Sequence, residues 1–125
     1  MSTLPVCQTL LLEPHNGVLH ITLNRPDSRN AMSLQMVSEL RAVLAAVHDD
    51  RATRALVIGG AGGHFCAGGD IKDMANARAQ GQDAYRDLNR AFGALLEETQ
   101  HAPQVVITVL QGAVLGGGFG LACVS

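Results

Sequence analysis

The segment VVITVLQGAVLGGG, residues 105–118, decides the fold, because it joins an apolar strand to a glycine turn. Its first part, Val105 to Val109, is β-branched and uncharged, as is typical of a buried strand. Gly112 then interrupts the run, and Gly116-Gly117-Gly118 permits a sharp turn. We therefore expect a strand over residues 104–110 and a helix that begins within or just after the glycine triplet.

A transmembrane helix is the alternative interpretation of this region. Residues 105–124 contain no charged residue, and Gly112, Gly116 and Gly120 have the four-residue spacing of a packing face in membrane helices. However, three consecutive glycines would each disfavour a helix interior by roughly 0.8–1.0 kcal/mol relative to Ala. No Trp or Tyr flanks the segment. We favour strand, turn and helix, with a membrane-anchored fragment through 105–124 as an open alternative.

The remaining sequence alternates strand and helix patterns. Two strands, residues 6–13 and 18–24, flank Asn16-Gly17, a strong hairpin signal. Ser33 is placed to cap a helix that runs to about His48 with one apolar stripe. The run ALVI, residues 55–58, predicts a strand covered on both faces.

Two more helices are expected in the second half of the chain. Asp70 precedes one of them, with Asp73 placed like the acidic partner of a capping box. The other helix spans 83–101 and ends before Pro103. The resulting order of strand, strand, helix, strand, helix, helix, strand and helix predicts an α/β fold in one domain.

Composition excludes several classes of function. The 125 residues carry a net charge of −2, which leaves no electrostatic footprint for nucleic acid or an anionic membrane. The three cysteines, Cys7, Cys66 and Cys123, have no metal-ligand spacing, so no metal site is expected. No secretory signal opens the chain, and we predict a cytoplasmic protein.

A second glycine segment, Cys66-Ala67-Gly68-Gly69-Asp70, also leads into a predicted helix. The first N–H groups of a helix lack intrahelical partners, and glycine lets a ligand approach the backbone closely. One N–H from each glycine segment could therefore converge on a single oxygen and stabilise an enolate or alkoxide. Each such donor lowers the activation barrier by roughly 2.7–4 kcal/mol. The alternative is that each segment is only a tight turn.

Three stretches of the sequence together resemble the crotonase, or enoyl-CoA hydratase/isomerase, superfamily. They are LNRP at 23–26 with NAM at 30–32, FCAGGDIKDM at 65–74, and residues 105–109 with 112–118. The resemblance implies a crotonase-like superhelix of ββα units. It also implies that residues 1–125 form the N-terminal part of the catalytic domain, cut short after the glycine-triplet turn.

The resemblance also implies a site. The backbone N–H groups of Ala67 and Gly117 would form an oxyanion hole for an acyl-CoA thioester. Asp70 would mainly cap its helix. Coenzyme A would enter as part of the substrate, so no separate cofactor is implied. The residues expected along the substrate are Arg25, Phe65, Cys66, Gly68, Gly69, Asp70 and Gly116.

The implied activity is hydration, dehydration or double-bond isomerisation through an enolate, as a lyase or isomerase of fatty acid metabolism. Hydratases of the family carry a Glu where this chain has Gly120, and their second Glu would lie beyond Ser125. No general base can therefore be named, and the resemblance does not imply turnover by the fragment itself. The alternative is a non-catalytic acyl-CoA-binding or interaction module. The family also implies a homo-oligomer, a trimer or hexamer.

Overall fold

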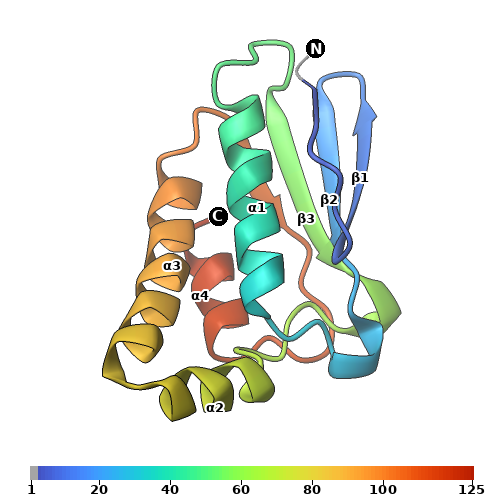
Figure 1. Ribbon diagram of the computed structural model, residues 1–125. Helices are drawn as coiled ribbons and strands as arrows, with labels where there is room; N and C mark the ends of the chain where they lie inside the picture. The colour runs from blue at the N-terminus through green and yellow to red at the C-terminus, as the bar shows by residue number, and fades with distance from the viewer. Residues whose placement is uncertain (1–2) are drawn as a thin grey trace.

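The computed structural model describes residues 3–125 and shows a sheet whose one face is covered by helices (Figure 1). The strand order is β1-β2-β3-β4. Strand β1 (Leu10–His15) pairs antiparallel with β2 (Val18–Leu23). Strands β3 (Ala55–Gly60) and β4 (Val105–Thr108) continue the sheet in parallel. The carboxyl ends of β2, β3 and β4 therefore lie at one edge, where the loops that follow them meet.

The predicted hairpin is confirmed. Asn16 and Gly17 both have positive φ, at 50° and 83°, which matches the twist of the two strands that they join. The register places His15 opposite Val18.

The first strand begins later than predicted, at Leu10 instead of Val6. The N–H groups of Gln8 and Thr9 donate to the Glu39 carboxylate at 2.9 and 2.8 Å, so these donors are bound to a helix, although the Thr9 carbonyl still accepts from the Asn24 N–H at 2.8 Å. The last strand is likewise shorter than the expected 104–110. The side chain of Gln104 is buried and donates to the Val47 carbonyl.

Helix α1 (Leu34–Val47) forms as the sequence predicts. Its N-cap is Ser33, whose Oγ accepts from the Met36 N–H at 3.1 Å. The apolar stripe of α1 packs on alternating strand residues, and the register places Leu19 opposite Leu56 in the core. Burial of these apolar side chains is the main contribution that stabilises the packing of α1 on the sheet.

Three further helices and two 3-10 turns complete the predicted element order. They are η1 (Pro26–Ser28), η2 (Ala61–Gly63), α2 (Ile71–Gln80), α3 (Gln82–Gln100) and α4 (Gly117–Cys123). Helix α4 begins inside the glycine triplet, as expected.

The segment from 105 to 124 is not one continuous helix, since it forms β4, a turn and the short α4. Within residues 3–125, no helix has the length and apolar character needed to span a membrane.

Candidate active site

The two glycine segments lie side by side, although almost fifty residues separate them in sequence. Cys66 forms a parallel bridge with Val114. The Cys66 N–H donates to the Ala113 carbonyl at 3.0 Å, and the Leu115 N–H donates to the Cys66 carbonyl at 3.0 Å. We call residues 66–69 together with 113–117 the glycine ladder. It extends the parallel pairing of β3 and β4 beyond their carboxyl ends, the edge at which α/β sheets bind ligands.

A third segment holds the other side of the glycine ladder. Met32 bridges to Gly69, and its N–H donates to the Gly68 carbonyl at 2.7 Å. The Asp70 N–H in turn donates to the Met32 carbonyl at 3.0 Å. Residues 66–70 are therefore fixed from both sides before any ligand binds.

Close packing explains why glycines occupy this ladder. Gly68 and Gly116 have φ of +111° and +50°, values that other residues rarely adopt. A Cβ on Gly116 would lie 3.6 Å from the Gly68 Cα, so the two backbones nearly touch. A Cβ on Gly118 would overlap the Cys66 carbonyl oxygen.

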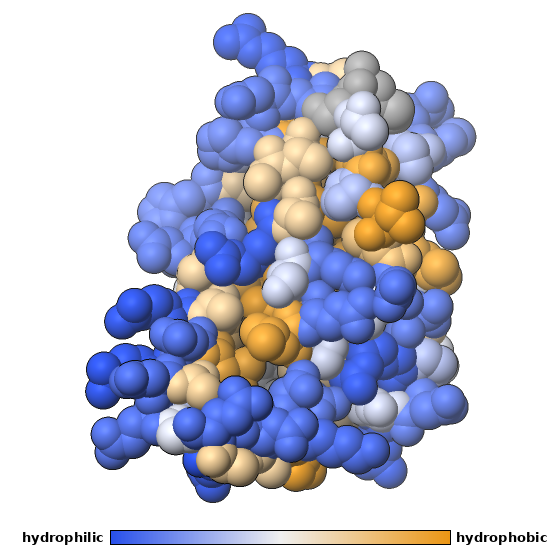
Figure 2. Space-filling view, in the orientation of Figure 1, coloured by the Kyte–Doolittle hydropathy of each residue, from blue (hydrophilic) through white to orange (hydrophobic). Residues whose placement is uncertain are grey.

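A cavity of about 280 Å³ opens beside the glycine ladder. Its floor is backbone from both glycine segments, and its walls are mostly apolar side chains of α1, α2 and α3. Figure 2 shows apolar surface gathered in the area framed by these three helices, near the lower centre of the view. The lining residues are Met32, Val37, Gly69, Asp70, Asp73, Met74, Leu88, Asn89, Phe92, Gly116 and Gly117.

The backbone donors of the ladder differ in availability. The Ala67 N–H donates to the Arg29 carbonyl at 3.1 Å, and Ala67 does not line the cavity. Gly69 and Gly117 both line it, and neither N–H has a hydrogen-bond partner among residues 3–125. Two residues whose N–H groups have no partner among residues 3–125, one from each segment, therefore line the same cavity.

Phe65 and Cys66 contribute to the site through their backbone groups, because their side chains are buried. Both are 0% exposed. The Phe65 N–H donates to the Gln111 carbonyl at 2.8 Å, which adds a further bond between the segments. Burial raises the pKa of the Cys66 thiol, so it stays protonated and is a poor nucleophile.

Asp70 caps α2, as predicted, with its Oδ1 accepting from the Asp73 N–H at 3.0 Å. Its Oδ2 also pairs with the Arg25 guanidinium at 3.0 Å, and Arg25 donates further to the Ala31 carbonyl. Asp73 differs from the capping-box expectation. Its carboxylate accepts from the Leu34 N–H at 2.7 Å and so links α2 to α1.

This ion pair predicts a pH-dependent stability. Burial raises the pKa of Asp70, but the Asp73 N–H and the Arg25 guanidinium offset it, so the pKa lies below its ordinary value. A lowered carboxyl pKa stabilises the fold above the unfolded pKa of about 4, and that stabilisation is lost as pH falls through the folded pKa. Urea titration should show wild type more stable than Asp70→Asn at pH 7, with the difference shrinking below about pH 4. A difference that does not change with pH would contradict this.

Asn30 is a structural residue that sequence reasoning missed. It is 0% exposed, and its Oδ1 accepts from the Arg25 N–H at 2.8 Å. Its Nδ2 donates to the carbonyls of Ala61 and His64 at 2.9 and 2.8 Å. The only signal in the sequence was its place in the NAM motif. The side chain holds the loop after β2 against the loop after β3.

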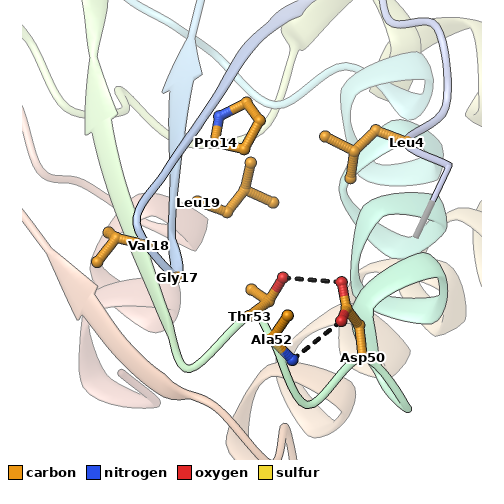
Figure 3. A pocket seen from close by; sticks show the side chains of 8 residues that line it. All are labelled: Leu4, Pro14, Gly17, Val18, Leu19, Asp50, Ala52 and Thr53. Atoms are coloured by element: carbon orange, nitrogen blue, oxygen red, sulfur yellow. Dashed lines mark hydrogen bonds between the residues drawn. The ribbon is translucent and has the colours of Figure 1, made fainter. Parts of the chain in front are cut away.

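Two further features lie outside the cavity beside the glycine ladder. A small cavity at the end of the hairpin has mostly apolar walls, and its Asp50 bonds the Ala52 N–H and the Thr53 hydroxyl (Figure 3). His64 accepts from the Ala113 N–H at 2.8 Å and so supports the ladder. In the part of the chain that the structure describes, no group of His, Cys, Asp or Glu could hold a metal ion.

Comparison with known proteins is consistent with this geometry. The family model described as enoyl-CoA hydratase/isomerase matches residues 13–125. The structure of Pseudomonas aeruginosa AtuE is 76% identical, with a TM-score of 0.93, and the match covers 94% of this chain. An enoyl-CoA hydratase/isomerase from Marinobacter aquaeolei is 56% identical, with a TM-score of 0.92, over 95% of this chain.

The chain spans less than half the length of these relatives. It covers 46% of the AtuE chain and 47% of the Marinobacter chain. A mitochondrial 3-hydroxyisobutyryl-CoA hydrolase of Rattus norvegicus is 38% identical over 113 residues, which are 90% of this chain and 29% of the hydrolase. The names of these relatives include both hydratase/isomerase and hydrolase, so the likeness alone does not select one reaction.

Proposed function

Because the chain belongs to the enoyl-CoA hydratase/isomerase family, we propose that its glycine ladder binds and polarises the thioester carbonyl of an acyl-CoA. The observation that carries the proposal is that Gly69 and Gly117, from two joined segments, line one cavity and that neither N–H has a hydrogen-bond partner among residues 3–125. Two backbone donors directed at one oxygen stabilise the negative charge that develops on it as an enolate forms.

The donors in this proposal are the N–H groups of Gly117 and Gly69. Gly117 is the residue that the sequence analysis named. Gly69 takes the role assigned there to Ala67, because the Ala67 N–H already has a partner in the Arg29 carbonyl. Gly68 and Gly116 would let the thioester approach the backbone, and Arg25, paired with Asp70, would hold the neighbouring loop.

Proton transfer is the part of the reaction that these residues do not supply. The carboxylates of Asp70 and Asp73 line the cavity, but backbone N–H groups and Arg25 already bind them. The lowered pKa of Asp70 also makes it a weak base. Gly120 has no side chain that could act. We propose that the whole protein carries out hydration or isomerisation through an enolate, with a base from outside this cavity.

Titration with crotonyl-CoA tests the proposal. The 125-residue chain should bind it saturably in a calorimeter, and free coenzyme A should bind more weakly because it lacks the carbonyl. The absorbance of the conjugated thioester should not decay. A folded chain that binds neither molecule would overturn the proposal, and decay of the absorbance would overturn the assignment of Asp70 as a structural residue.

A non-catalytic acyl-CoA-binding module is the second candidate, favoured by the engaged carboxylates and by Gly120. Such a module would bind the thioester without polarising its carbonyl. Cytoplasmic localisation, lyase chemistry, fatty acid metabolism and assembly as a trimer or hexamer stay predictions.

A further inference from the structure

A side chain, and not only backbone, joins the two glycine segments. His64 follows η2 and precedes Phe65, and its Nδ1 accepts from the Ala113 N–H at 2.8 Å. Gly112 packs against the same ring, since a Cβ built on it would lie 2.5 Å from this Nδ1. The imidazole therefore lies directly against the backbone that leads from β4 to the glycine triplet.

The imidazole takes the place of a backbone acceptor. The Leu115 N–H donates to the Cys66 carbonyl at 3.0 Å, and such bonds are evenly spaced along a parallel pair of strands. On this register, the Ala113 N–H would donate to the His64 carbonyl. That carbonyl instead accepts from the Asn30 Nδ2 at 2.8 Å. The His64 ring supplies the acceptor that the Ala113 N–H then needs.

Only a neutral imidazole can accept this hydrogen bond. To accept at Nδ1, the ring must carry its single proton on Nε2, whereas an imidazolium is protonated on both nitrogens and only donates. Protonation of His64 would therefore place an N–H against the Ala113 N–H and break the contact. Histidine is the side chain that ordinarily changes its charge between about pH 5 and 8, so the contact is sensitive to pH.

The surroundings of the ring offer a protonated His64 no compensating partner. Strand β4 and the chain that follows it carry no charged residue, and neither does η2. The η1 loop packs against η2 and brings Asp27 and Arg29, which are both exposed. Among residues 3–125, neither of them bonds the imidazole, and Asp70, the next carboxylate along the chain, pairs with Arg25.

The bond to His64 bears on the proposed oxyanion donor because Ala113 closely precedes Gly117 in the chain. Leu115, which lies between them, is bonded into the ladder through its N–H. The Leu115 carbonyl accepts from the Gly118 N–H at 2.8 Å, so the first turn of α4 is built on this residue. When the Ala113 N–H loses its acceptor, this short run is less firmly held, and the Gly117 N–H is free to shift.

We propose that His64 is a positioning residue, whose neutral imidazole holds the Ala113 backbone so that the Gly117 N–H is directed at the thioester oxygen. The inference rests on the proposed function, since it concerns the same donor. Protonation of His64 removes the acceptor at Nδ1, so polarisation of the carbonyl by the glycine ladder weakens as the pH falls. The site is therefore most effective at neutral and higher pH.

Crotonyl-CoA titrations of wild type and His64→Asn at about pH 7.5 and about pH 5.5 test this inference. The Asn Oδ1 takes the place of Nδ1 and accepts at both pH values, because an amide does not titrate in this range. We expect wild type to bind about tenfold more weakly at the lower pH, as suits an N–H left without its partner, and His64→Asn to change by less than about twofold. His20→Asn, at an exposed histidine on β2, is the matched control and should keep the wild-type pH dependence.

The infrared stretching frequency of the labelled thioester carbonyl adds a measurement that only positioning would change. The phosphates of coenzyme A also titrate near about pH 6 and can alter its affinity, but they do not touch the carbonyl. In wild type, the frequency of bound crotonyl-CoA should return towards the value of free crotonyl-CoA at the lower pH. In His64→Asn, it should stay the same at both pH values.

The outcomes separate this inference from the proposed function. The same pH dependence in wild type and His64→Asn would overturn the inference while the proposed function stands. Loss of the pH dependence in His20→Asn would overturn it too, since the titrating group would then lie elsewhere. If circular dichroism shows that only wild type unfolds at the lower pH, His64 holds the whole fold instead of the donor, and the inference fails. If neither wild type nor His64→Asn binds crotonyl-CoA at the higher pH, the proposed function fails and the inference fails with it.

Discussion

Replacing Gly118 by Ala is expected to destabilise the chain by about 1–3 kcal/mol, the usual range for forcing atoms into a packed site. A Cβ at this position would overlap the Cys66 carbonyl oxygen and lie 2.6 Å from the Cys66 Cβ. That carbonyl accepts from the Leu115 N–H, so the added methyl group would push directly on the glycine ladder. Urea denaturation followed by circular dichroism measures the change in the free energy of unfolding.

Gly120→Ala is the matched control within the same helix. Its Cβ would lie 3.5 Å from Leu96 Cδ1, an ordinary contact. Because Ala favours a helix over Gly by up to about 1 kcal/mol, this variant should be neutral or more stable. The same Gly→Ala change should therefore lower the free energy of unfolding at position 118 and leave it unchanged or raise it at position 120. Equal stability of the two variants would contradict the close approach of α4 to Cys66.

Replacing Asn30 by Ala should also have a large effect, lowering the free energy of unfolding by about 3–5 kcal/mol. The substitution leaves the Arg25 N–H and the carbonyls of Ala61 and His64 without their partner, and each unsatisfied buried group costs about 1–3 kcal/mol. Asn30 also has φ of +58°, which Ala adopts less readily than Asn. Urea denaturation should show a much lower midpoint, and crotonyl-CoA binding should weaken as the loops separate.

Asn76→Ala controls for the loss of an amide at an exposed site on α2. Surface changes of this kind are usually within about 0.5 kcal/mol. If Asn30→Ala falls in the same narrow range, the amide does not hold the two loops together.

Local signals in the sequence predicted most of the elements. Asn16-Gly17 specified the hairpin, Ser33 the start of α1 and Asp70 the start of α2, because each acts on backbone groups within a few residues. The strand before the glycine triplet also formed, though shorter than expected, and it places the two glycine segments after the carboxyl ends of the parallel strands β3 and β4. The resemblance to the enoyl-CoA hydratase/isomerase family is confirmed by the family match over 13–125.

Long-range contacts explain what the sequence could not predict. The Glu39 carboxylate accepts hydrogen bonds from the N–H groups of Gln8 and Thr9, just before the first strand, and no spacing rule connects these residues. Asp73 likewise bonds Leu34 instead of its own helix. The partner of the Ala67 N–H, the Arg29 carbonyl, comes from a loop nearly forty residues earlier. Because this contact engages the Ala67 N–H, our proposal gives Gly69 the role that the sequence analysis gave to Ala67.

The most direct test of the central claim is the infrared stretching frequency of the thioester carbonyl in crotonyl-CoA bound to the chain, isolated with a carbonyl-13C label. Donation from Gly117 and Gly69 should lower this frequency relative to free crotonyl-CoA. Gly117→Pro removes one donor at a helix position that tolerates proline, whereas Gly117→Ala adds a similar Cβ and keeps the N–H. The account predicts a clear downward shift that Gly117→Ala retains and Gly117→Pro reduces. A frequency that is the same in bound and free crotonyl-CoA would contradict it.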